Sequence, residues 1–191
     1  VVTLGWLAKT ATDVFRAARE VRAGAARERW PRERLLAFQH ERLAKLVAHA
    51  SAASPFHRAH YGGTLAPADV RLADLPPVTK RMMMEHFDEF TTDRRLTRAA
   101  VEAHLAALGA DDELFLGTYR VMASSGSSGR KGFYVYDRAA WTAFLAGAMR
   151  SVRSMGITPR LPRRRLAFVA APDAKHMTRR GTASLRIGPF R

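Results

Sequence analysis

The chain has no cysteine among its 191 residues. This absence excludes disulfides, thiolate metal sites and a cysteine nucleophile. No apolar run reaches about 18 residues, so no transmembrane helix is expected. The chain starts at Val1 without the short apolar core and small-residue cleavage site of a secretory signal. We therefore expect a cytoplasmic location.

Acidic residues and lysine are scarce. Of the 32 Lys and Arg residues, 5 are Lys and 27 are Arg, and against 17 Asp and Glu they give a net charge of +15. Such a charge attracts anionic partners, including nucleic acids and phosphate-bearing small molecules. The arginine clusters at 163–165 and 179–180 are not interleaved with aromatic residues, so a solvated Arg-rich surface is favoured over nucleic-acid binding.

The periodicity of apolar residues predicts a largely helical first half. The apolar fraction of 47% rules out disorder throughout, and the length suits one domain, or one and a part. A helix is predicted over 4–22, and it either packs on the core or lies on a membrane surface, with packing favoured. Its apolar residues near one face are Leu4, Leu7, Ala11, Val14, Phe15 and Ala18. Further helices are predicted at 32–53, at 80–89 with Thr79 as its cap, at 98–108, and from a cap at Asp137 to about residue 155.

Extended segments are predicted in the second half. Residues 114–123, 133–136 and 166–170 have strand-like composition, whereas 61–77 is rich in Gly and Pro and indicates a loop. The alternation of strands with a helix predicts an α/β region. The consecutive methionines 82–84 are expected to fill the core.

A small, polar loop joins the first two predicted strands. It runs Ser124-Ser125-Gly126-Ser127-Ser128-Gly129-Arg130-Lys131-Gly132. Glycines let backbone N–H groups approach an anion closely, and successive amides and hydroxyls can surround a phosphate. The spacing does not fit a Walker loop, a dinucleotide fingerprint or a hydrolase nucleophile elbow. The loop is therefore either a polyphosphate-binding loop or a flexible Gly/Ser connection without a ligand.

The segment Ser124–Gly129 resembles the phosphate-binding signature of the adenylate-forming superfamily of acyl-CoA ligases. It matches that signature fully, and Lys131 stands where the family usually has Pro. Residues 43–58, ending in Ser54-Pro55-Phe56-His57-Arg58, resemble a helix and its exit in the phenylacetate–CoA ligase and CapK-type branch. Leu75-Pro76-Pro77-Val78-Thr79-Lys80 and Met84–Asp88 resemble further elements of that branch, in the same order.

This resemblance implies a carboxylate-activating ligase that uses ATP and Mg²⁺. Such enzymes form an acyl-adenylate and pyrophosphate, and then usually transfer the acyl group to CoA. By resemblance, the residues that hold the ATP phosphates are Ser124, Ser125, Gly126, Ser127, Ser128 and Gly129, with charge support from Arg130 and Lys131. His176, beyond the predicted strand 166–170, is a candidate for the acyl pocket, and a structural or solvent-exposed role is its alternative.

The resemblance also implies a domain organisation. The fold class expected is α/β: a helical N-terminal portion, then part of the N-terminal core of an adenylate-forming enzyme, with the phosphate loop between two antiparallel strands. Residues 1–31 would form an N-terminal helix and linker, and 32–191 a partial core domain. The catalytic lysine and the lid domain are expected outside this chain, so we expect these residues alone not to complete adenylation. The alternatives are a non-catalytic interaction fragment and a basic nucleic-acid-binding module.

Overall fold

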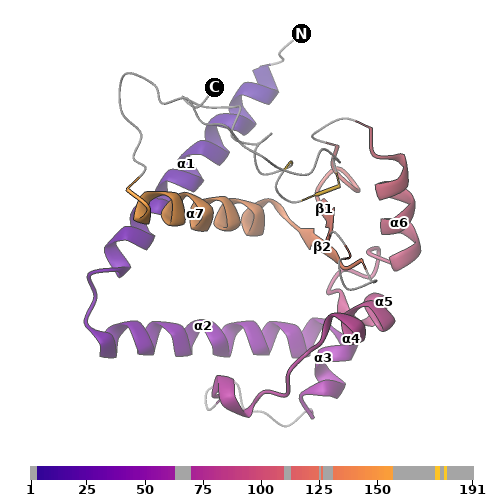
Figure 1. Ribbon diagram of the computed structural model, residues 1–191, viewed down its shortest axis with the longest axis horizontal. Helices are drawn as coiled ribbons and strands as arrows, with labels where there is room; N and C mark the ends of the chain where they lie inside the picture. The colour runs from indigo at the N-terminus through magenta and orange to yellow at the C-terminus, as the bar shows by residue number, and fades with distance from the viewer. Residues whose placement is uncertain are drawn as a thin grey trace. The chain divides into compact units, whose positions relative to one another are not determined.

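The computed structural model describes residues 4–62, 70–109, 113–124, 126, 131–156, 175, 176 and 179, with side chains described from residue 15 onward. Helices dominate, and one small sheet pairs two antiparallel strands (Figure 1). The chain is therefore broadly α/β, as predicted. The elements in order are α1 (Leu4–Arg27), α2 (Arg32–Ala53), α3 (Pro55–His60), the 3-10 helix η2 (Leu72–Asp74), α4 (Lys80–Glu85), α5 (Phe87–Phe90), α6 (Arg98–Ala107), β1 (Arg120–Ala123), β2 (Phe133–Tyr136) and α7 (Arg138–Ser154).

The chain divides into two compact units. The first combines Val1–Arg29, Ala107–Ser125 and Tyr134–Arg191, and the second combines Trp30–Ala106 with Gly126–Phe133. In the first unit, α1 packs on α7 although the two helices lie far apart in the sequence. Within the described ranges, no helix is both long and apolar enough to cross a bilayer.

The face of α1 that packs differs from the predicted one. Phe15 is 71% exposed and Ala18 is also exposed, so this end of the predicted apolar face does not pack on the core. Instead Gly24 is buried, and a Cβ built there would lie 2.6 Å from Cδ of Arg150 on α7. Arg150 also pairs with Glu28 at 3.1 Å. Contact with α7 thus selects a glycine-containing face, which the hydrophobic pattern of α1 alone did not identify.

The sheet of the first unit is shorter than predicted. β1 is confined to Arg120–Ala123, with Val121 and Met122 fully buried. The prediction of a strand over 114–119 is wrong, because Phe115 and Tyr119 form a bridge across a tight turn. Leu116 and Gly117 in that turn have φ values of +53° and +66°, in the left-handed region that reverses the chain.

The start of α7 follows the predicted cap. The Asp137 side chain accepts a hydrogen bond of 2.7 Å from the backbone N–H of Ala140. Trp141 is buried and stacks on Phe144, with the ring centroids 5.1 Å apart. The C-terminal part of α7 is less buried: Val152 is 41% exposed and Ala148 is exposed.

The second unit begins with α2, whose bounds agree with the prediction. Its apolar residues are not uniformly inward: Val47 is 3% exposed, whereas Leu36 and Leu46 are 50% and 64% exposed. At its end, Ser54 is fully buried and caps α3 by accepting from the backbone N–H of His57. The Ser54 hydroxyl also donates to the carbonyl of Glu89 on α5, at 2.9 Å, which fixes α3 against α5.

The predicted helix over 80–89 is divided into α4 and α5. Thr79 caps α4 as predicted, accepting from the N–H of Met82 at 3.2 Å. His86 adopts φ −111° and ψ 27°, outside helical values, and separates the two helices. This break lets Met84 and Phe87 both turn inward, where they are buried. The methionine run is therefore only partly core, since Met82 and Met83 are half-buried.

Candidate phosphate-binding loop and its surroundings

The predicted phosphate loop joins the end of β1 to the start of β2. Of its predicted binding residues, Ser124, Gly126 and Lys131 are described by the structure. Ser124 and Gly126 are half-buried and Lys131 is exposed. The remaining predicted binding residues lie outside the described residues: Ser125, Ser127, Ser128, Gly129 and Arg130.

Gly126 gives the loop its clearest conformational signature. Its φ is +73°, in the left-handed region that glycine adopts without the steric cost of a Cβ. A left-handed residue within a short polar loop turns successive N–H groups toward one side, as in anion-binding backbone nests. A left-handed residue of this kind is one half of such a nest, and Gly126 supplies it in the predicted phosphate loop.

Both ends of the loop are fixed by buried residues. Val121 and Met122 anchor the strand before it. After it, the backbone N–H of Phe133 donates to Sδ of Met84 at 3.4 Å, and the Phe133 ring meets Phe87 edge-on at 6.1 Å. The residues on each side of the loop are therefore held by packing within their own unit.

His176 lies beside the entrance to this loop. It forms a parallel bridge with Ala123, and the Ala123 N–H donates to the carbonyl of Lys175 at 2.9 Å. His176 is half-buried, and the bridge places it next to Ala123, the residue before Ser124. The predicted strand 166–170 that would lead to it lies outside the described residues.

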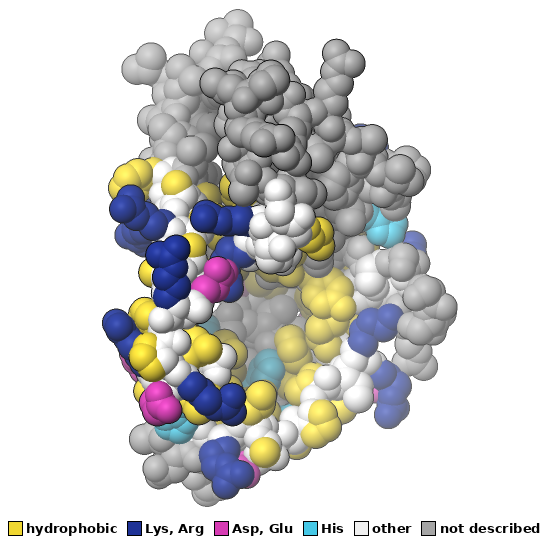
Figure 2. All heavy atoms as spheres, turned by 60° about the vertical axis from the view of Figure 1, so that its left-hand side comes forward, with side chains coloured by type: hydrophobic (Ala, Val, Ile, Leu, Met, Phe, Trp, Pro, Cys, Tyr) yellow, Lys and Arg dark blue, Asp and Glu magenta, His cyan; other side chains and the backbone are white. Residues whose placement is uncertain are grey.

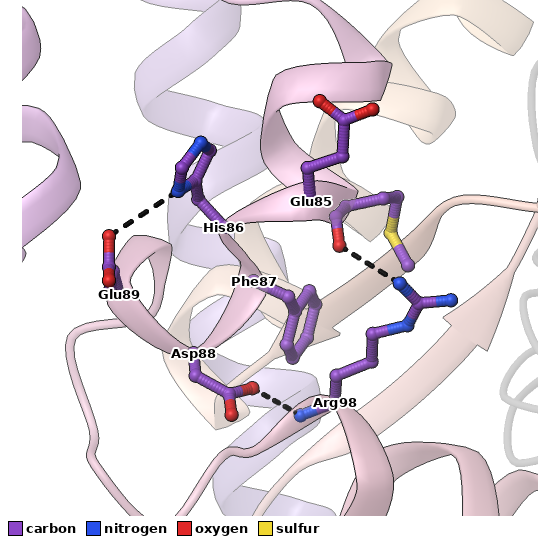
Figure 3. A pocket seen from close by; sticks show the side chains of 7 residues that line it. Glu85, His86, Phe87, Asp88, Glu89 and Arg98 are labelled. Atoms are coloured by element: carbon purple, nitrogen blue, oxygen red, sulfur yellow. Dashed lines mark hydrogen bonds and ion pairs between the residues drawn. The ribbon is translucent and has the colours of Figure 1, made fainter.

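A separate pocket of about 270 Å³ opens in the second unit (Figure 3). Its polar groups bind one another: the Asp88 carboxylate accepts from the backbone N–H of Arg98 at 2.6 Å, and the Arg98 guanidinium donates to the carbonyl of Met84 at 3.3 Å. His86 lies 3.5 Å from the Glu89 carboxylate. These bonds connect α4 and α5 to the start of α6. Its lining is Met84, Glu85, His86, Phe87, Asp88, Glu89 and Arg98.

Sequence reasoning missed a histidine–aromatic cluster centred on Phe56. His60 stacks on the Phe56 ring at 5.2 Å, and His57 and His86 lie 5.4 Å and 5.6 Å from it. Burial, and secondarily the charge of His60, lowers the pKa of His57. The spacing of His57 and His60 on one helix was a visible signal, but only the fold adds His86.

Hydrogen bonding fixes the tautomer of His57. Ser54 Oγ donates its hydrogen to Glu89 and accepts from the His57 backbone, and it lies 2.9 Å from His57 Nδ1. A hydroxyl has one hydrogen and two lone pairs, so Nδ1 must be the donor in the third bond. No set of three or more His, Cys, Asp or Glu side chains in the described ranges is arranged to hold a metal ion.

Comparisons with family models, with curated proteins and with solved structures found no match to this chain. The fold and the loop geometry therefore carry the functional argument together with the sequence pattern.

Proposed function

We propose that this chain forms the ATP-phosphate-binding part of a carboxylate-activating ligase of the adenylate-forming type. The observation that carries the proposal is the left-handed backbone of Gly126 in a Ser/Gly loop between two antiparallel strands. The sequence pattern Ser124–Gly129 supports the same role. In this proposal the loop holds the β- and γ-phosphates of ATP, and Mg²⁺ accompanies the triphosphate.

The proposed reaction has two steps. A carboxylate oxygen attacks the α-phosphorus of ATP, the bond to the bridging oxygen breaks, and pyrophosphate leaves. The thiol of CoA loses its proton to water and the sulfur attacks the acyl carbonyl, and AMP leaves with the pair of electrons from the acyl–oxygen bond. Backbone N–H groups of the loop, with Lys131 and Arg130, offset the charge that develops on pyrophosphate. The cytoplasm, where ATP and CoA are available, is the proposed location.

His176 belongs to the same proposal as a contributor to the acyl pocket. Its bridge to Ala123 supports this role, because it lies beside the chain segment that leads into the phosphate loop. A small carboxylic acid is the proposed substrate class.

Nucleotide titration of the 191-residue chain tests the loop directly. We expect ATP and inorganic tripolyphosphate to bind, and Gly126→Val to weaken both by about tenfold or more, because valine disfavours the left-handed backbone. Gly156→Val is the matched control. Gly156 also has a left-handed φ, of +76°, with open space around it, but it follows α7.

Three outcomes would contradict the loop assignment: no affinity of the wild-type chain, unchanged affinity of Gly126→Val, or equal losses in both glycine variants. The reaction itself is tested on the complete gene product by carboxylate-dependent exchange of pyrophosphate into ATP. We expect exchange there and none with the 191 residues alone. ATP binding without exchange in the complete gene product would support a non-catalytic role instead.

A further inference from the structure

The outward side of α1 is a continuous basic and apolar face. Every exposed residue between 15 and 26 lies on this side of the helix, at spacings of one, three and four residues. They form what we term the outer face of α1: Phe15, Arg16, Ala18, Arg19, Arg22 and Ala26. Packing against α7 uses the opposite side, around Gly24, so α7 does not cover the outer face.

The charge of this face has one sign. It carries Arg16, Arg19 and Arg22 and no acidic residue. Arg19 lies 3.9 Å from Glu20, which is half-buried at the edge of the face. Neither Arg16 nor Arg22 makes an ion pair within the part of the chain that the structure describes. On the visible face in Figure 2, Lys and Arg side chains recur while Asp and Glu side chains are few.

Phe15 distinguishes this face from a merely solvated cationic surface. Its side chain is 71% exposed at the N-terminal end of the described face, in line with Arg19 and Arg22. An exposed phenyl ring on the same helix face as arginines fits the boundary between lipid headgroups and acyl chains, where the ring enters the apolar layer and the arginines reach phosphates.

We propose that the outer face of α1 binds an anionic lipid surface, independently of the proposed ligase function. Charge complementarity selects the anionic headgroups, and the exposed Phe15 supplies an apolar group that can enter the acyl-chain boundary of a lipid surface. The face also carries Ala18 and Ala26, small apolar residues that do not obstruct its approach to a lipid surface. It extends about 16 Å along the helix, the length over which several headgroups are contacted.

Vesicle flotation of the 191-residue chain tests this proposal. The probes are phosphatidylcholine vesicles with and without about 30 mol% phosphatidylserine, at about 50 mM and 300 mM salt. We expect binding only to the anionic vesicles. The double variant Arg19→Glu/Arg22→Glu should reduce that binding by about 25-fold or more, since each lost basic residue near such a surface costs about fivefold.

Matched control variants distinguish binding by the outer face of α1 from attraction due to the net charge of the chain. Arg32→Glu/Arg42→Glu alters two exposed arginines of α2 and gives the same net charge, and it should bind nearly as well as the wild type. Phe15→Ser should reduce binding by about tenfold and make the remainder more salt-sensitive. Leu46→Ser, which changes a 64% exposed residue of α2, should have no such effect. Circular dichroism confirms that each variant keeps its helix content.

Four results would overturn the proposal: no binding to anionic vesicles at low salt, equal binding to neutral vesicles, equal losses in both double variants, or no effect of Phe15→Ser. A separate test uses a single-stranded oligonucleotide. Tight binding that is lost in Arg19→Glu/Arg22→Glu, without vesicle binding, would identify nucleic acid as the occupant instead. The results of these binding tests do not depend on whether the chain has ligase activity.

Discussion

At the residue scale, Ser54 is a buried polar residue of the second unit that connects α3 with α5. Its single hydroxyl caps α3, bonds the α5 carbonyl of Glu89 and fixes the tautomer of His57, all from a fully buried site. A buried polar group with all its bonds made stabilises, whereas its removal leaves buried partners unpaired. Small polar residues thus control the geometry where α2, α3 and α5 meet.

Replacing Ser54 with Ala should lower the free energy of unfolding by about 2–3 kcal/mol, because a cap and a buried carbonyl bond are lost together. Urea denaturation measures the change. Thr79→Ala is the matched control, since Thr79 caps α4 from an exposed site through one bond, and it should cost about 1 kcal/mol. Equal costs for the two variants would show that the buried contacts of Ser54 contribute nothing.

His57 should make the stability depend on pH. Burial lowers the pKa of folded His57 below its ordinary value of 6.5, so the unfolded state binds the proton more readily. The contribution to stability is therefore complete above about pH 6.5 and is lost as the pH falls through the folded pKa.

Thermal unfolding between about pH 8 and pH 5 measures this dependence, and His57→Gln should flatten it. Identical slopes in both proteins would assign the dependence to other groups. A fall in stability with rising pH across this window would reverse the sign and contradict the lowered pKa.

At the scale of elements, caps and turns decide where each helix and strand begins and ends. Thr79, Asp137 and Ser54 each hold the N-terminus of a helix through a side-chain oxygen. His86 divides what the sequence pattern presents as one helix, and the left-handed pair Leu116 and Gly117 shortens what it presents as one strand. Local hydrogen bonding therefore overrides periodicity at these boundaries.

Asp137 connects the end of β2 to the start of α7, so its removal tests the joint between the two elements. Asp137→Ala should lower the unfolding free energy by about 1 kcal/mol, whereas Asp137→Asn, which can still cap, should cost less. Chemical denaturation compares them. If the two substitutions are equally costly, the effect comes from charge at the helix N-terminus and not from the capping bond.

At the scale of the whole molecule, the net charge of +15 is the dominant property. Several exposed ion pairs are present, including Lys45 with Glu41 and Arg98 with Glu102, but pairs of this kind contribute little each. These pairs leave an excess of positive charge, and repulsion within that excess destabilises the compact state.

Added salt should consequently raise the thermal midpoint. Raising NaCl from about 10 mM to 300 mM shortens the screening length from about 30 Å to below 10 Å, so repulsion between distant arginines weakens. A gain of about 1 kcal/mol would appear as a rise of about 2–4 °C. Scanning calorimetry measures it, with sucrose as an uncharged control. An unchanged or falling midpoint would show that the charges are locally compensated.

The sequence alone determined the local elements. The bounds of α2 and β2, and the caps at Thr79 and Asp137, follow from composition and hydrogen-bonding chemistry within a few residues, which is information that the sequence carries directly. It also determined the position of the Ser/Gly loop between two strands. Its phosphate-binding role, and the activity built on it, remain a prediction.

Tertiary structure alone decided which faces are buried and which distant residues meet. The contact of α1 with α7 through Gly24 left Phe15 exposed, the approach of α5 placed His86 beside Phe56, and the bridge to Ala123 brought His176 to the loop. A helix with apolar residues on more than one side can pack in several ways. The choice among them depends on the partner surface, which lies far away in the sequence and contributes no local signal.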